Sequence, residues 1–359
     1  MKNKCFKLFA CCIPVKGASR SIICDLQRGS FEYIPNILYD IVIDVPNLTL
    51  NEIKEKFEFK FNDIIDSYFE FLIEHELGFW CNKNEISDFP EIEKTWESPS
   101  TITNAIIDFD KKSKHNVEKV CRELDILGCK ALELRFYDEI EIDNLSDILG
   151  CFQKSRLRSI SLIMKYDTKI NKQDWERLCC DNQRVKQVVF HSSNSNRVID
   201  LQKTYTKLTF QTNTFDSELC CGVINSKYFS VNIDLFTEAQ SFNTCLNRKI
   251  SIDKHSNIKN CPSSKIAFGN INETSLIGIA KNIEFQRLWL INKEEINVCK
   301  KCEFRFICTD CRVYLQDTED IYSKPLKCGY NPDSCEWEEW SLNPLKQKSM
   351  DIYKTLHNT

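Results

Sequence analysis

Residues 299–311 read Cys-Lys-Lys-Cys-Glu-Phe-Arg-Phe-Ile-Cys-Thr-Asp-Cys, and Cys328 follows shortly after them. The cysteines have the spacing C-x2-C-x5-C-x2-C. A C-x2-C turn directs two sulfurs at one ion or at one edge of a cluster, so this spacing is typical of soft metal centres. The lysines and arginines among the cysteines favour thiolates and offset the negative charge of a thiolate-bound metal. The segment therefore predicts metal binding near the C-terminus.

The composition indicates a multidomain globular protein. A chain of 359 residues can form about two or three domains. Its 20 cysteines are scattered apart from the one dense block, which differs from a short secreted disulfide scaffold. A net charge of −4 without a basic stripe argues against a nucleic-acid partner. No segment approaches the roughly 20 apolar residues of a membrane span, so we expect no membrane association and a cytoplasmic location with reduced thiols.

Residues 1–90 predict a small sheet followed by helices, the layout of a winged helix-turn-helix. The third predicted helix is acidic, which argues against a helix that faces DNA phosphates. A capping box at Thr49 and Glu52 predicts the start of the second helix. We expect strands at 6–15, 20–26 and 31–34, and helices at 36–43, from about 50, and at 62–77.

Residues 101–240 alternate between strand and helix patterns. Repeated β–α units indicate a parallel sheet with crossover helices, so the fold class is α/β. The later helical patterns are weak, and we therefore expect a degenerate, partial (β/α) barrel or an open sheet. The predicted strands lie at 101–109, 131–137, 158–166, 185–190, 207–211 and 228–236.

Two kinds of metal centre fit the cysteine block. A structural zinc site would need only four ligands. Six or seven cysteines on short loops suit two centres better, which favours iron–sulfur clusters over zinc. Trp337 and Trp340 are expected to shield a cluster.

The remaining cysteines are interpreted as packing residues. Adjacent side chains on a strand point to opposite faces, and a buried free cysteine behaves as a small hydrophobe. This interpretation covers the pairs Cys11/Cys12, Cys179/Cys180 and Cys220/Cys221.

The order of seven cysteines in the C-terminal third resembles the SPASM domain of radical S-adenosylmethionine peptide-maturing enzymes, which holds auxiliary iron–sulfur clusters. The resemblance covers about 245–340, within a predicted domain at 241–345. Ser256 stands where that family prefers glycine, and the usual C-x3-C step is shortened to Cys308-x2-Cys311. The cysteines that match are Cys245, Cys261, Cys299, Cys302, Cys308, Cys311 and Cys328.

The resemblance implies up to two [4Fe-4S] clusters, with zinc as the alternative metal. One cluster would be held by Cys299, Cys302, Cys308 and Cys328. The other would use Cys245, Cys261 and Cys311, and its fourth position would be open or filled by another group such as Cys335.

One motif of the radical enzymes has no counterpart in this sequence. Those enzymes carry C-x3-C-x2-C just after the first barrel strand, where this chain reads Asp-Phe-Asp-Lys-Lys-Ser-Lys-His at 108–115. A lysine-rich turn cannot replace three soft ligands, so radical S-adenosylmethionine chemistry is not expected.

The N-terminal module resembles the leader-recognition elements of ribosomally made peptide pathways. In such modules a precursor's leader adds a strand to the sheet edge, and backbone hydrogen bonds supply affinity. We expect that edge in the 6–34 sheet, with a groove beside the third helix.

As a whole, the chain resembles the SPASM-domain peptide maturase of grasp-with-spasm cassettes, in which an ATP-grasp ligase crosslinks a precursor peptide. This implies a bacterial cytoplasmic iron–sulfur protein that takes part in peptide maturation with that ligase; whether the chain is itself an enzyme stays open. The segments that carry the resemblance are 12–17, 25–28, 33–35 and 308–312.

Two other functions remain in view. The first is a non-catalytic adaptor or chaperone, stabilised by zinc or a cluster, that presents the precursor to the ligase. The second is a winged-helix regulator that senses redox state. The sequence has no phosphate loop of the form G-x4-G-K-[ST], so ATP would be bound by the partner.

Overall fold

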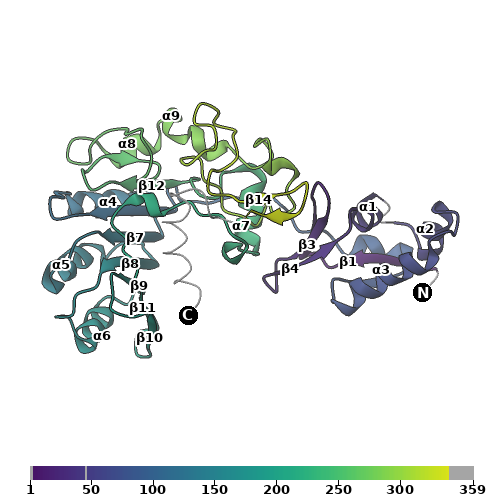
Figure 1. The fold of residues 1–359 in the computed structure, drawn as a ribbon, viewed down its shortest axis with the longest axis horizontal. Coiled ribbons are helices and arrows are strands. Elements are labelled where there is room, and N and C mark those ends of the chain that lie inside the picture. The colour runs from purple at the N-terminus through teal and green to yellow at the C-terminus, as the bar shows by residue number, and fades with distance from the viewer. Residues whose placement is uncertain (1–2, 45–46, 339–359) are drawn as a thin grey trace.

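The N-terminal part of the chain forms two small antiparallel sheets with three α-helices (Figure 1). The computed structural model describes residues 3–44 and 47–338. A meander has the strand order β2-β3-β4, and β1 pairs separately with β5. The elements are β1 (Cys5–Leu8), β2 (Cys12–Lys16), β3 (Ser21–Asp25), β4 (Ser30–Ile34), α1 (Asn36–Asp44), α2 (Leu50–Lys56), α3 (Asn62–Glu74), β5 (Gly78–Cys81) and the short helix η1 (Lys83–Asp88).

A turn splits the strand that was predicted at 6–15. The amide of Cys12 donates to the Phe9 carbonyl at 2.8 Å, which ends β1 and starts β2 in a new direction. The two strands then join different sheets, because β1 pairs with β5 while β2 pairs with β3. The prediction of one continuous strand was wrong at this point.

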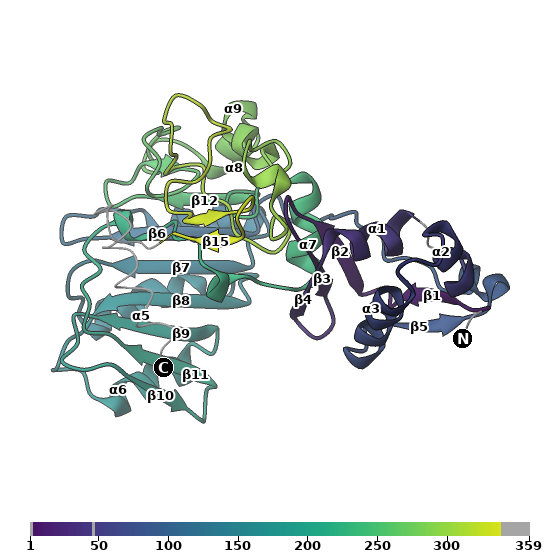
Figure 2. The same ribbon diagram turned by 45° about the vertical axis from the view of Figure 1, so that its right-hand side comes forward.

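The middle of the chain forms a mixed α/β layer with a mostly parallel sheet of eight strands (Figure 2). The strand order is β10-β11-β9-β8-β7-β6-β12-β13, with antiparallel strands only at the two ends. The sheet is therefore open. Its elements are β6 (Asn104–Phe109), α4 (Val117–Ile126), β7 (Ala131–Phe136), α5 (Ile142–Phe152), β8 (Ser159–Lys165), α6 (Lys172–Asp181), β9 (Val185–His191), β10 (Arg197–Leu201), β11 (Thr206–Phe210), β12 (Lys249–Ile252) and β13 (Ile258–Lys259).

The helices α4, α5 and α6 cover one face of this sheet (Figure 1). Successive strands β6 to β9 advance in one direction across the sheet, and right-handed crossovers then place every connecting helix on the same side. The largest apolar core lies between these helices and the strands. Nowhere in residues 3–44 and 47–338 does a helix have the length and apolar composition needed to cross a bilayer.

The strand expected at 228–236 does not form, and a helix begins at Ile233 in its place. Its residues alternate between apolar and polar, which is the pattern of a strand. However, the Asn232 side chain accepts a hydrogen bond from the Leu235 amide at 2.9 Å and so caps α7 (Ile233–Ser241). Cap chemistry therefore decides the local structure here.

The C-terminal third is built mainly from loops and very short elements. Its hairpin β12–β13 extends the main sheet, because β12 pairs in parallel with β6. The end of the domain predicted at 241–345, including Trp340, lies beyond the described residues. The remaining elements are η2 (Glu218–Cys220), η3 (Ser226–Tyr228), α8 (Leu276–Ala280), α9 (Ile283–Gln286), η4 (Arg287–Leu290), η5 (Cys299–Lys301), β14 (Tyr330–Asn331) and β15 (Glu336–Trp337).

The N-terminal meander packs against the cysteine-rich region. Val15 and Ile22 share an apolar core with Phe304 and Phe306. At the edge of this contact, Arg20 Nε donates to Glu303 Oε1 at 2.8 Å, and the Glu303 side chain is fully buried. Removing the N-terminal module would therefore expose an apolar face on both parts.

Glu238 on α7 makes the stability of the fold depend on pH. Burial raises the pKa of this carboxyl from 4.5 to about 7, although its hydrogen bond from Asn247 Nδ2 at 2.8 Å opposes the rise. The folded protein therefore favours the neutral carboxylic acid relative to the unfolded chain, and stability falls as the pH rises from about 4.5 through about 7. The loss is on the order of 2 kcal/mol.

We expect Glu238→Gln to remove most of this pH-dependent loss, because glutamine keeps the hydrogen-bond acceptor for Asn247 and carries no charge. Urea unfolding at pH 5 and pH 8 measures the difference. Glu284, on α9 and exposed, is the matched control, and Glu284→Gln should leave the difference as in the unmodified chain. Equal pH dependence in Glu238→Gln and the unmodified chain would contradict the assignment.

Candidate metal centres

Four of the predicted cysteines line one small cavity in the cysteine-rich region. Cys299 lies on η5, Cys302 follows it directly, Cys308 sits in the next turn, and Cys328 comes from the loop before β14. The cavity has a volume of about 30 Å³. Its other walls come from Ile224, Phe229, Lys293, Val298, Phe304, Arg305, Lys324, Tyr330, Pro332 and Trp337.

Burial has the largest effect on the pKa values of the thiols in this first group. It raises the pKa of the Cys308 thiol to about 12, while the nearby Lys293 ammonium lowers it. Burial also raises the pKa of Cys299 and Cys302. Lys293 is 4% exposed, and its Nζ donates to the Cys308 carbonyl at 2.7 Å. Only a bound cation would make several thiolates stable together in such a site.

A second group of cysteines gathers where the cysteine-rich region meets the main sheet. Cys245 and Cys261 lie either side of the β12–β13 hairpin, and Cys311 approaches them from the dense block. Burial raises the pKa of the Cys261 thiol to about 12, and the Cys221 and Cys245 thiols raise it further. Burial, followed by Cys245, likewise raises the pKa of Cys311 to about 12. Cys221 is therefore a fourth member of this group.

Cationic side chains surround the second group. Arg135 Nη1 lies 3.6 Å from Cys221 Sγ, and Lys249 Nζ lies 3.7 Å from Cys245 Sγ. Lys327 Nζ donates to the Cys221 carbonyl at 2.5 Å. Two of these side chains lie close to a thiol and the third holds the backbone of Cys221, although burial lowers the pKa of Lys327. Cations beside the group offset the charge of a thiolate-ligated centre.

The local backbone explains how Cys221 reaches this position. Cys221 ends η2, and Gly222 follows with a φ of 85°, a conformation that glycine adopts without strain. A Cβ on Gly222 would lie 3.0 Å from Cys311 Sγ. The segment then pairs with the first group's loop through the bridge between Ile224 and Cys328. The same few residues thus connect both groups.

The sequence pattern predicts a packing role for Cys221. That interpretation suits its neighbour Cys220, which is fully buried in an apolar cluster with Tyr137 and Phe215. Cys335, the earlier candidate for the fourth position, lies elsewhere, with its Sγ 3.8 Å from the Pro332 carbonyl. The one local signal for Cys221 was the glycine that follows it.

A hydrogen-bonded cluster of acidic and basic side chains lies at the carboxyl ends of β6 and β7. Arg135 donates to both Asp108 oxygens at 2.6 and 2.8 Å, and Tyr137 Oη donates to Asp108 Oδ2 at 2.5 Å. His115 Nε2 lies 2.8 Å from the Asp108 carbonyl, and its Nδ1 lies 2.9 Å from Ser256 Oγ. Arg135 reaches Cys221 as well, so this cluster borders the second group.

Ser256 takes a backbone conformation that favours glycine. Its φ is 69°, in the left-handed region, and it follows Asp253 in the turn between β12 and β13. The position that sequence analysis singled out as an expected glycine is therefore one where glycine would fit without strain.

A third set of possible metal ligands lies in the N-terminal module. Among the described residues, the set of His, Cys, Asp or Glu ligand atoms that all lie within 4.8 Å of one another is Cys11, Cys12 and Asp25. No disulfide joins the 20 cysteines, all of which lie within the described residues. The chain thus has a possible metal site in addition to its two wider groups of four cysteines.

Comparison of the sequence with models of known protein families and with curated proteins gives no match. The functional conclusions therefore depend on the sequence patterns and on the geometry of the two cysteine groups.

Proposed function

We propose that this chain is an iron–sulfur protein that takes part in the maturation of a ribosomally made peptide, together with an ATP-grasp ligase. One observation carries the proposal: two groups of four cysteines form where the SPASM-like pattern implies two centres. Cys299, Cys302, Cys308 and Cys328 make the first group. The second contains the three cysteines named by the pattern and Cys221.

The spacing of the sulfurs supports clusters over single zinc ions. Tetrahedral zinc with Zn–S bonds of about 2.3 Å holds its sulfurs about 3.8 Å apart. Neither four-cysteine group brings three or more sulfurs within 4.8 Å of one another in the described part of the chain. A cubane cluster is larger than one ion and takes its thiolates from further apart. Bound clusters would supply electron transfer and crosslink the loops of the cysteine-rich region.

The chain's own residues fit two such centres. Lys293 beside the first group, and Arg135, Lys249 and Lys327 beside the second, can balance cluster charge. The left-handed Ser256 at the expected glycine also supports the resemblance. The hydrogen-bonded cluster around Asp108 supports a role without cleavage of S-adenosylmethionine, because it fills the strand end where the radical enzymes hold three cysteines.

Anaerobic reconstitution with iron and sulfide tests this proposal. Two [4Fe-4S] clusters would give about eight iron and eight sulfide per chain, with the broad absorption at roughly 400 nm that thiolate-bound iron produces. A colourless protein with zinc in the same cysteine groups would instead favour the structural adaptor that presents the precursor to the ligase.

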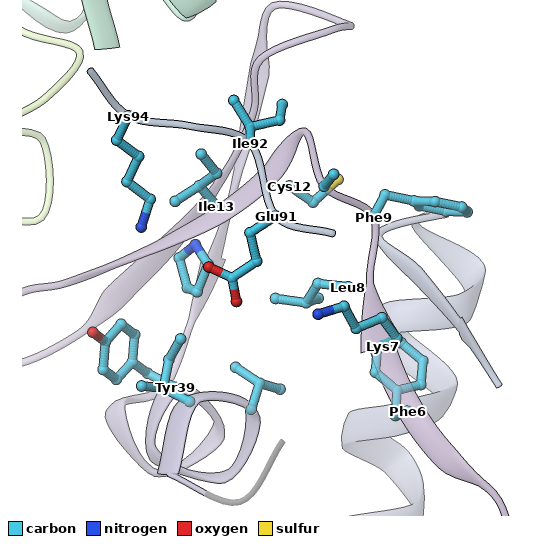
Figure 3. Close-up of a pocket in the computed structure, with 14 residues that line it drawn as sticks. Phe6, Lys7, Leu8, Phe9, Cys12, Ile13, Tyr39, Glu91, Ile92 and Lys94 are labelled. Carbon is cyan, nitrogen blue, oxygen red and sulfur yellow. The ribbon is translucent and has the colours of Figure 1, made fainter. Parts of the chain in front are cut away.

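A groove in the N-terminal module supports peptide binding. It lies in the fork between β1, β2 and α1 and has a volume of about 280 Å³ (Figure 3). Linker residues Glu91, Ile92 and Lys94 cross it, and Lys7 and Glu91 point their charged ends into it. This groove is beside α1, whereas the sequence predicts one beside the third helix.

The groove favours side-chain anchors over strand addition. β2 is an edge strand of the meander, and Pro14 in its centre has no amide donor. A leader peptide with apolar anchors and at least one charged residue would match the lining, which mixes Phe6, Leu8 and Tyr39 with lysine and glutamate side chains. We therefore place leader recognition in this fork.

We expect Ile43→Glu to weaken leader binding by about tenfold or more, because it puts a charge against the apolar anchor. Ile37 is the matched control: both isoleucines lie on α1 and are 43% exposed, but only Ile43 lines the groove. Ile37→Glu should leave affinity within about twofold. Fluorescence polarisation of a labelled leader peptide on the full chain measures both, and equal losses would place recognition outside the groove.

A further inference from the structure

Cys11, Cys12 and Asp25 form a compact set of ligand atoms outside both groups described above. Their two sulfurs and a carboxylate oxygen all lie within 4.8 Å of one another. Cys12 and Asp25 are each 3% exposed, and Cys11 is half-buried at the turn before β2. Two thiols and one carboxylate in this arrangement are a donor set that suits zinc.

The backbone explains why two adjacent cysteines meet at one point. In a regular strand, neighbouring side chains would point to opposite faces. Cys11, however, lies in the turn that the Cys12 amide closes onto the Phe9 carbonyl at 2.8 Å. Its own carbonyl accepts from the Leu26 amide at 2.9 Å, which draws the turn against the end of β3. Cys12 lies in the apolar core of the N-terminal module and Cys11 packs against it, as the sequence predicts, but Cys11 is in a turn, so the two side chains do not point to opposite faces of one strand.

Asp25 is held in place through one of its two oxygens. Asp25 Oδ1 accepts from the amides of Gln27 at 3.0 Å and Arg28 at 2.9 Å, so the carboxylate closes the turn after β3. Asp25 Oδ2 lies 3.6 Å from Arg28 Nη1, beyond hydrogen-bond distance. The carboxylate is thus oriented by the backbone and keeps a lone-pair oxygen for a ligand role.

A divalent cation would offset most of the negative charge of this set. Two thiolates and one carboxylate carry three negative charges, and a zinc ion carries two positive charges. The Arg28 guanidinium lies 3.6 Å from Asp25 Oδ2 and also pairs with Glu76 Oε2 at 2.5 Å, so it is shared between two carboxylates and need not leave to admit the ion. Without a cation, three acidic groups would share one largely buried site beside a single arginine.

We propose that Cys11, Cys12 and Asp25 bind one zinc ion, with a fourth position open to water beside the half-buried Cys11. The ion would crosslink the turn between β1 and β2 to the end of β3. It is separate from both four-cysteine groups and does not depend on iron. Binding converts thiols to thiolates and releases their protons, so zinc affinity rises with pH.

Metal analysis of the full chain tests the site. After anaerobic reconstitution and removal of loosely bound metal, the unmodified chain should hold one zinc more than Cys11→Ser does, with equal iron and sulfide in both. Asp25→Asn keeps the acceptor for the Gln27 and Arg28 amides but loses the charge, and it should weaken zinc binding by about tenfold or more. Cys180→Ser, at an exposed cysteine on α6, is the control and should keep the zinc.

The iron count separates this proposal from the proposed function. If zinc fills the four-cysteine groups, total zinc rises, but Cys11→Ser still lowers it by one per chain. Cobalt added to the apo site should give the visible bands of a tetrahedral thiolate complex, and Cys12→Ser should remove part of their intensity. Equal zinc in Cys11→Ser, Asp25→Asn and the unmodified chain, all folded by circular dichroism, would overturn the site.

Discussion

Replacement of Cys308 by serine is expected to lower the iron content from about eight to about four per chain after anaerobic reconstitution. Cys308 is 7% exposed and lines the cavity that it shares with Cys299, Cys302 and Cys328. A serine hydroxyl is a harder and weaker ligand for iron than a thiolate, and loss of one of four ligands weakens the whole site. Because ligation and folding are coupled, the midpoint of thermal unfolding should fall by roughly 5 °C or more.

The matched control is Cys180→Ser, which removes an exposed thiol from α6. Iron, sulfide and thermal unfolding should match the unmodified chain in this variant. Lys293→Met removes the buried ammonium beside Cys308 and leaves all four sulfurs. Its iron content and unfolding midpoint should therefore lie between those of Cys308→Ser and Cys180→Ser. If Cys308→Ser keeps both its iron and its unfolding midpoint, the first group is not a cluster site.

The first group could be anticipated because its spacing is local. Three of its cysteines fall within ten residues, and a C-x2-C turn fixes the direction of two sulfurs almost independently of the rest of the fold. Cys328 was named only through the resemblance, since nothing between it and Cys308 specifies a contact. In the structure, the pairing of Ile224 with Cys328 holds that loop in place.

The alternation of strand and helix in the middle of the chain was also readable, because the hydrophobic period changes clearly from one element to the next. Two errors have a common origin. At Cys12 and at Asn232 the apolar pattern continued through a residue whose backbone or side-chain hydrogen bonds end one element and begin another. These hydrogen bonds depend on the conformation of about three consecutive residues, and the hydrophobic period of a sequence does not report that conformation.

The second group could not be derived from spacing. Cys221 lies far before Cys245 in the sequence, beside a cysteine that is buried in an apolar cluster. What distinguishes the two neighbours is tertiary: Arg135 comes from β7 and approaches Cys221 alone. The short helix η2 and the left-handed Gly222 then turn the second thiol toward Cys311.

Because Cys220 and Cys221 have different surroundings, their substitution should have different effects on the iron content. Cys221→Ala should remove one thiolate from the second group, so the iron content should fall below about eight per chain, either by one iron or by a whole cluster. Cys220→Ala changes the adjacent thiol and should keep the full iron content, although it removes a buried sulfur from the cluster with Tyr137 and Phe215. Iron and sulfide analysis of both variants, with the absorption spectrum, measures the contrast.

The cations beside the second group offer a further test of whether Cys221 is a ligand. Arg135 lies 3.6 Å from Cys221 Sγ and also holds Asp108, so its removal would disturb two partners. Lys249 Nζ lies 3.7 Å from Cys245 Sγ, and Lys249→Met should shift the reduction potential of the second centre downward while all iron is retained. If Cys221→Ala keeps all its iron and Cys220→Ala loses it, the fourth ligand is Cys220, and η2 must turn the other way when the cluster is bound.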